Sequence, residues 1–168
     1  MATQNGRTAP AELVVDGEYS DERFIDMMAA HHAMAIEMAK VAQRNAEHQE
    51  VRRLAEEMIS EQQGQIEELS SIKEREFGSS EVADTMNPQD SSMCAMLMPD
   101  QLAEQRPFDE AFIDSNAPHH AAGVEMAGVA LMQSANPEIQ RLARQIVDAQ
   151  SLELGQMIGW RRQWYPEG

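Results

Sequence analysis

The 168-residue sequence has one cysteine and few aromatic residues, which make up 5% of the chain. Because Cys94 has no second cysteine to pair with, no disulfide can form within the chain. With so few aromatic side chains, a core must be built from Ala, Leu, Ile, Val and the 13 methionines. This composition favours helices over strands. The sequence therefore predicts an all-α fold.

Basic residues and long apolar runs are also scarce. Thirteen Lys and Arg stand against 29 Asp and Glu, which gives a formal net charge of −16. Binding to phosphates requires a basic face, so we expect no nucleic-acid partner. No run of 18 apolar residues is present, so we expect no membrane-spanning helix. The N-terminal segment lacks the basic start and apolar stretch of an export signal.

Two segments of the chain repeat each other at a distance of 88 residues. Residues 24–72 align with residues 112–160 without a gap, and 17 of the 49 aligned pairs are identical. A repeat of this length indicates one structural unit used twice. The predicted organisation is a single domain of residues 1–168, with internal repeats 21–75 and 107–165 joined by a Met-rich connection, residues 76–106.

Each repeat has the pattern of two helices. Ser20 is a favourable N-cap for the first helix, and its counterpart in the second repeat opens at Pro107. Asn136 and Pro137 are the N-cap and first residue of the last helix, and His48 occupies the matching cap position in the first repeat. Because neither hairpin alone buries its apolar face, we expect the two to close into a ferritin-like four-helix bundle.

Two pairs of adjacent histidines, His31–His32 and His119–His120, occupy equivalent positions in the repeats. In the first helix of the first repeat, five charged residues fall in an arc only about 80° wide, so both His31 and His32 lie on the wide apolar side that faces the interior. These charged residues are Glu22, Asp26, Glu37, Lys40 and Arg44. Central glutamines lie on the apolar faces of the second helices. Buried polar groups are costly without partners. The histidines therefore either bond to glutamines and lock the register of the bundle, or bind a metal.

Methionines accompany the histidines unequally in the two repeats. On a helix, Met27, Met34 and Met38 fall within about 60° of arc around His31. The stripe of the second repeat keeps only Met126. There Glu153 stands where the first repeat has Gln65, and a carboxylate ligand would make that site prefer a harder metal ion. Imidazole with thioether suits Cu(I) and Ag(I), and the histidines also suit Cu(II) or Zn(II).

The connection contains a dense group of soft ligands, since four methionines and Cys94 lie within 13 residues. Packing in a loop does not require this density, so we interpret the segment as a soft-metal tract. The alternative is an apolar strap over one end of the bundle. Pro99 indicates a short helix after the tract. The predicted metal ligands of the whole chain are His31, His32, Met27, Met34, Met38, His119, His120, Met126, Glu153, Met93, Cys94, Met96 and Met98.

The four-helix bundle is also the fold of the di-iron carboxylate enzymes, which are therefore an alternative class. Their sites need a Glu three residues before a ligand histidine. The residues at those positions are Met28, Ala29, Asn116 and Ala117. The sequence therefore argues against a di-iron site. It also shows no Ser-His-Asp or Cys-His nucleophile set, and we predict that the protein is not an enzyme.

The pattern F-I-D-x-x-x-x-H-H-x-x-x-x-E-M-A, followed by L-A and a central glutamine, occurs in both repeats. In these residues the chain resembles the ferritin-like family catalogued as domain of unknown function 305, in two tandem copies. Members of that family are typically bacterial, periplasmic or secreted, and associated with copper. The resemblance implies that copper is the bound metal, that the four histidines are ligands, and that the protein is periplasmic or secreted.

Together these features predict a copper-binding protein that sequesters or buffers Cu(I) and Ag(I) through interior His and Met. Two other functions stay open from the sequence. One is a metal-dependent redox enzyme on the same bundle. The other is a metal-free structural or partner-binding bundle, in which the histidines and glutamines only hold the register.

Overall fold

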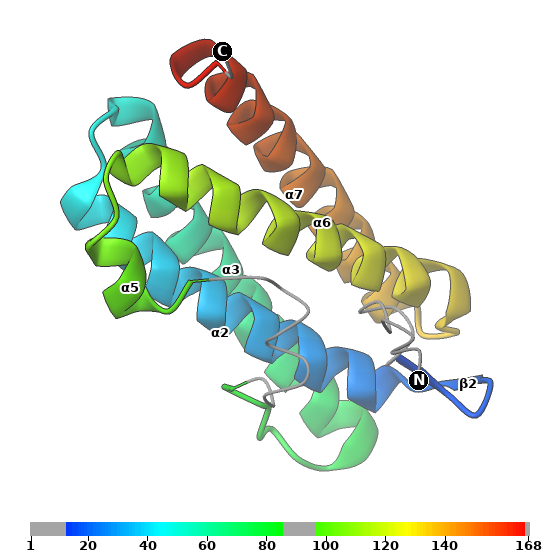
Figure 1. Cartoon of the computed structure of the whole chain (residues 1–168). Helices are drawn as coiled ribbons and strands as arrows, with labels where there is room; N and C mark the ends of the chain where they lie inside the picture. The colour runs from blue at the N-terminus through cyan, green and yellow to red at the C-terminus, as the bar shows by residue number, and fades with distance from the viewer. Residues whose placement is uncertain (1–12, 86–96, 167–168) are drawn as a thin grey trace, which may run out of the picture.

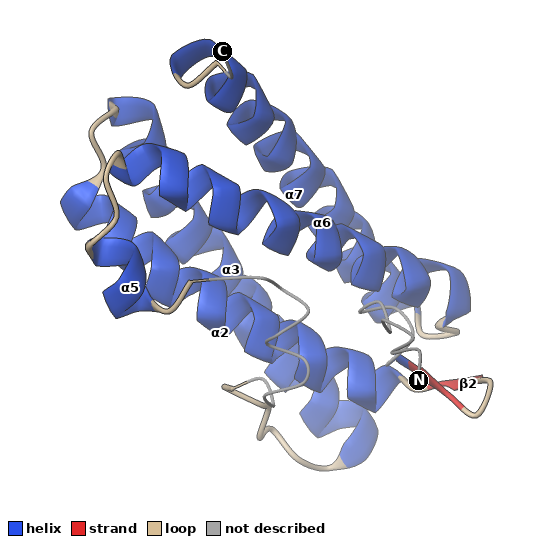
Figure 2. Ribbon diagram, viewed as in Figure 1, coloured by secondary structure: helices blue, strands red, loops and turns tan. Residues whose placement is uncertain are grey.

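The computed structural model describes residues 13–85 and 97–166, and almost all of its regular structure is helical (Figure 1). The helices are α2 (Asp21–Asn45), α3 (Gln49–Phe77), α5 (Pro99–Ala103), α6 (Phe108–Gln133) and α7 (Pro137–Trp164). Two short strands, β1 (Val14–Val15) and β2 (Glu18–Tyr19), form an antiparallel hairpin just before α2 (Figure 2). This small hairpin was not predicted from the sequence.

The four long helices pack as two hairpins. Helix α2 packs along α3, and α6 packs along α7. Between the hairpins, α6 lies against α2, whereas α3 and α7 meet at fewer positions (Figure 1). The prediction of an all-α fold with four main helices is therefore confirmed. The short helix α5 begins at Pro99, as expected, and packs against α2.

Two of the long helices, α2 and α7, begin with a local side-chain cap. Ser20 accepts a hydrogen bond from the Arg23 amide at the start of α2, and the side chain of Asn136 caps α7. Helix α6 begins at Phe108, one residue later than expected. The side chain of His48 does not cap α3, although His48 is the N-cap residue.

The missing cap comes from another helix. Asp109 of α6 is fully buried, and its carboxylate accepts hydrogen bonds from the backbone amides of Glu47 (3.0 Å) and His48 (2.7 Å). The Nδ1 atom of His48 also lies 2.7 Å from this carboxylate. A negative charge at a helix N-terminus is favourable, so Asp109 ties the start of α3 to the second hairpin.

The interior consists of two apolar clusters with a polar layer between them. The first apolar cluster surrounds Phe24, Leu69 and Ile139, and the second surrounds Phe112 and Met58. Along every long helix, a stretch of buried polar residues separates the part that enters one cluster from the part that enters the other. This polar layer comprises His31, His32, Gln62, Gln65, His119, His120, Gln150 and Glu153.

Candidate metal centre

The histidines of the two hairpins meet in the middle of the polar layer. The rings of His31 on α2 and His119 on α6 stack, with centroids 3.5 Å apart and an interplanar angle of 11°. The Nε2 atom of His31 donates a hydrogen bond to the backbone carbonyl oxygen of His119 at 2.9 Å. Both side chains are completely inaccessible to solvent. The fold therefore brings together two imidazoles that are 88 residues apart in the chain.

The other two histidines each bond to a residue on the partner helix of the same hairpin. His32 Nε2 donates to Gln65 Oε1 at 2.6 Å, and His120 Nε2 donates to Glu153 Oε2 at 2.8 Å. The two pairs have the same spacing of 33 residues. The sequence predicted bonds from the histidines to the central glutamines Gln62 and Gln150, but in the first hairpin the partner is Gln65, and Gln62 Oε1 has no partner among the described residues.

The hydrogen bonds fix the protonation of individual ring nitrogens. A carbonyl oxygen only accepts, so His31 and His32 carry their protons on Nε2 and leave Nδ1 with a free lone pair. Both Nδ1 atoms are buried without a partner among the described residues, as are both ring nitrogens of His119. The nitrogens of His120 instead face oxygen acceptors, namely Glu153 and the carbonyl of Asn116 at 3.0 Å.

Burial keeps the imidazoles of His31, His32 and His119 neutral. Desolvation lowers the pKa of His31 and of His119 well below the usual value, and neighbouring histidines lower both further. Desolvation likewise lowers the pKa of His32 to about 4. Neutral imidazole is the form that binds metals, so at neutral pH these three side chains need lose no proton to act as ligands.

The amide of Gln150 lies beside His31 in the polar layer. Neither its amide oxygen nor its amide nitrogen has a partner among the described residues. The amide packs against Gly123 of α6 so tightly that a Cβ atom at Gly123 would overlap its oxygen and lie 2.9 Å from Cε1 of His31. The absent side chain at Gly123 therefore lets an unpaired amide lie beside the stacked histidines.

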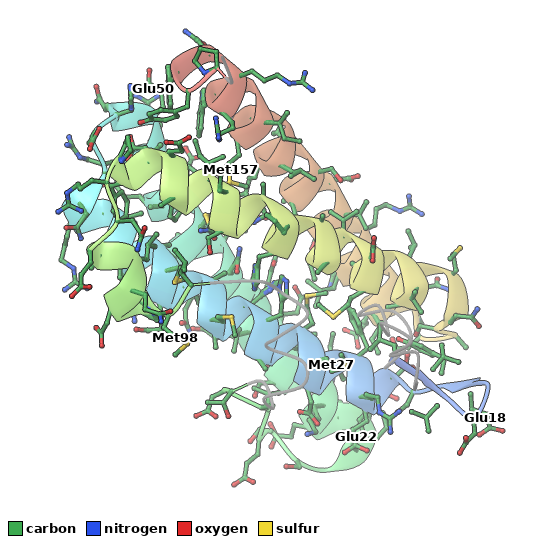
Figure 3. The ribbon with its side chains drawn as sticks, in the orientation of Figure 1. Glu18, Glu22, Met27, Glu50, Met98 and Met157 are labelled. Atoms are coloured by element: carbon green, nitrogen blue, oxygen red, sulfur yellow. The ribbon has the colours of Figure 1, made fainter. Side chains whose placement is uncertain are left out.

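The methionines of the predicted stripe are divided among different surroundings. Met27 packs against the first apolar cluster, and Met38 is buried in the second. Figure 3 shows Met27 and Met157, a member of the second cluster, far apart along the bundle. Met126 of the second repeat is buried in the first cluster. These side chains fill the core, as methionine commonly does.

Met34 occupies a different position from the other methionines of its helix. It lines a groove of about 690 Å³ among α2, α3 and α5, together with Met98, which is 64% exposed. Two thioethers thus share this groove. Three other predicted ligands, Met93, Cys94 and Met96, lie outside the described residues.

Sequence reasoning missed several residues of the centre. Gln65 had been noted only as the counterpart of Glu153, and Gly123 was not singled out, because a glycine inside a helical pattern does not by itself show whether another side chain packs against it. Among residues 13–85 and 97–166, no three His, Cys, Asp or Glu side chains converge as ligands of one ion. The donors on offer are imidazoles with free lone pairs in the polar layer and two thioethers in the groove beside α5. This is a soft set.

The fold and the site define an all-α protein with a buried imidazole layer between two helical hairpins. Residues 21–161 match the family described as domain of unknown function (DUF305), and the chain belongs to this family. No curated protein matches the chain. No helix in the described part of the chain is long and apolar enough to span a membrane.

Solved structures with the same fold include a copper-bound protein. CopM in the Cu(I)-bound form is 33% identical, with a TM-score of 0.77, and the match covers 88% of this chain and 99% of CopM. CopM in the Cu(II)-bound form is 35% identical, with a TM-score of 0.81 and the same coverage. A DUF305 fragment from Deinococcus radiodurans is 26% identical, with a TM-score of 0.73 over 83% of this chain and 93% of the fragment.

Proposed function

We propose that the protein binds copper in the polar layer and sequesters or buffers it as Cu(I), without catalytic turnover. The observation that carries this proposal is the set of three neutral, buried imidazoles, His31, His32 and His119, each with a ring nitrogen that has no partner in the described part of the chain. A buried polar atom without a partner costs about 1–3 kcal/mol. A bound ion would repay that cost.

The hydrogen bonds around these rings are those that a metal centre needs. A ligand histidine usually donates its second nitrogen to a carbonyl or carboxylate, which fixes the ring and its tautomer. His31 does so to the carbonyl of His119, and His32 does so to Gln65. The similarity to CopM, solved with Cu(I), Cu(II) and Ag bound, supports copper and silver as the ions.

Other predicted ligands have separate roles in this proposal. Met34 and Met98 offer soft donors in the groove beside α5, which we propose as a secondary Cu(I) contact. Glu153 holds His120 and would favour a harder ion such as Cu(II) or Zn(II) if that histidine were freed. Met93, Cys94 and Met96 stay predicted ligands, and a periplasmic or secreted location stays a prediction.

The proposal is tested by Cu(I) competition against a chromogenic chelator, with single variants of the layer. We expect His31→Ala and His119→Ala each to weaken Cu(I) binding about tenfold or more, because each removes a donor from the same pair. His48→Ala is the matched control, since His48 is the one histidine outside the layer. Fe(II) and Mn(II), which prefer carboxylates, should compete poorly.

The alternatives predict other results. A metal-free structural bundle would bind no Cu(I) tightly, and both layer variants would change only stability. A redox enzyme would show steady-state oxidase activity after copper loading, which we expect to be absent. Equal losses of affinity in His48→Ala and in the layer variants would place the metal elsewhere.

A further inference from the structure

The first hairpin contains a chain of hydrogen bonds that runs from the surface to His32. Glu61 of α3 is exposed at its outer end, and its Oε1 accepts from Nε2 of Gln65 at 3.1 Å. The other end of the same amide, Oε1 of Gln65, accepts from Nε2 of His32 at 2.6 Å. Glu61 and Gln65 are four residues apart, so they are neighbours on one helix face.

The second hairpin does without an equivalent of Glu61. There His120 donates directly to the carboxylate of Glu153. A carboxylate has two equivalent acceptor oxygens, so it accepts from a histidine whichever way it is turned. An amide has one donor end and one acceptor end, and it needs a third group to decide which end faces the ring. In the first hairpin, Glu61 is that third group, because its carboxylate accepts from the NH2 end of Gln65 and leaves the amide oxygen facing His32.

The orientation of the amide decides which nitrogen of His32 is free. With its oxygen toward the ring, Gln65 accepts the Nε2 proton and leaves Nδ1 as the lone pair. If the amide were reversed, its NH2 group would donate to Nε2, and the proton would move to Nδ1. The unpartnered Nδ1 of His32 would then no longer be available to an ion.

The carboxylate of Glu61 is held in surroundings that disfavour its charge. Partial burial and the neighbouring carboxylates of Glu153 and Glu57 raise the pKa of Glu61, and the bond from Gln65 works in the opposite direction. An exposed helix position would accept a neutral glutamine at no such cost. A glutamine at this position could also donate, whereas the carboxylate of Glu61 can only accept from the amide of Gln65.

We propose that Glu61 is a positioning residue for the metal centre, which fixes the amide of Gln65 and thereby presents Nδ1 of His32 as a ligand. This inference rests on the proposed function as far as the metal is concerned. Its structural part, the tautomer of His32, can be observed without any metal.

The first test measures the tautomer of His32 by ¹⁵N NMR of the metal-free full chain. We expect one Nε2-protonated form in the unaltered protein and a mixture with the Nδ1-protonated form in Glu61→Ala. The control is Glu56→Ala, which removes the same charge from an exposed position of the same helix. An unchanged tautomer in Glu61→Ala, or an equal change in Glu56→Ala, would overturn the proposal.

The second test measures Cu(I) affinity in a double-mutant cycle. We expect Glu61→Ala to weaken binding about three- to tenfold, the worth of one hydrogen bond. In the background of Gln65→Glu, which gives His32 the carboxylate that His120 already has, Glu61→Ala should no longer weaken binding. The same loss in both backgrounds would overturn the positioning role. A tautomer change without any Cu(I) binding in the unaltered protein would support the positioning and refute the proposed function.

Discussion

Gly123 sits where α6 comes closest to the buried amide of Gln150. We predict that Gly123→Ala lowers the free energy of unfolding by about 1–3 kcal/mol, because the new methyl group must displace Gln150 and the ring of His31. The steric cost should exceed the helix propensity gained, which is about 1 kcal/mol. Urea unfolding followed by far-UV ellipticity measures the change.

A second glycine of the same helix provides the control. A Cβ atom at Gly128 would meet nothing within 4 Å. Gly128→Ala should therefore stabilise the protein by about 0.5–1 kcal/mol, through helix propensity alone. If the two substitutions change stability in the same direction, Gln150 is not confined in the way the structure shows.

At the scale of single residues, the sequence predicted which histidines are buried better than it predicted which residues they contact. The narrow polar arc of the first helix correctly placed His31 and His32 inside. It could not say that His31 would stack on His119, because that contact joins two helices whose relative rotation no local pattern determines. Gln62 and Gln65 share one helix face, and only the packing of α2 selects Gln65 as the partner of His32.

At the scale of the helix, the start of α3 depends on a residue from the other hairpin. We predict that Asp109→Ala lowers the free energy of unfolding by about 3 kcal/mol, since it leaves the amides of Glu47 and His48 without their charged acceptor. Asp109→Asn, which retains an acceptor oxygen, should cost less. Urea unfolding of the three proteins gives the comparison.

Asp114 lies on the same helix and makes a solvent-exposed ion pair with Arg161 at 2.7 Å. Surface ion pairs contribute at most about 1 kcal/mol, so Asp114→Ala should have a small effect. A loss as large as that of Asp109→Ala would mean that charge on α6, rather than the cap, determines stability.

The starts of the helices were the most predictable part of the fold. Caps and prolines act within a few residues, so Ser20, Pro99 and Asn136 were sufficient to locate three helix starts. The cap on α3 was not predictable, because Asp109 follows it by about 60 residues. Where the methionines of the stripe pack was not predictable for a related reason. Its members share one side of a helix but extend into different neighbours.

For the whole molecule, the polar layer makes stability depend on pH. His31, His32 and His119 have pKa values below that of an unfolded histidine, about 6.5. Below that pH the unfolded chain binds protons that the folded chain does not. The contribution of these histidines to the free energy of unfolding is therefore complete above about pH 6.5. It falls as the pH decreases toward the folded pKa, which is about 4 for His32.

We predict a slope of about 1.4 kcal/mol per pH unit for each such histidine in the metal-free protein. Urea unfolding at a series of pH values between 7.5 and 4.5 measures this slope. The variant His119→Gln has one buried imidazole fewer and should show a shallower slope. A stability that stays constant from pH 6.5 to 5 would show that the layer accepts protons without cost.

The separation of the core into two apolar clusters has a spectroscopic consequence. Both tryptophans of the chain, Trp160 and Trp164, lie near the end of α7 and pack against the second cluster. Trp164 also stacks on His48, with centroids 3.8 Å apart. Tryptophan fluorescence therefore reports on one end of the bundle and not on the other, whereas ellipticity averages over all the helices. Superposition of the two signals during unfolding thus measures whether the polar layer couples the two ends into one cooperative unit.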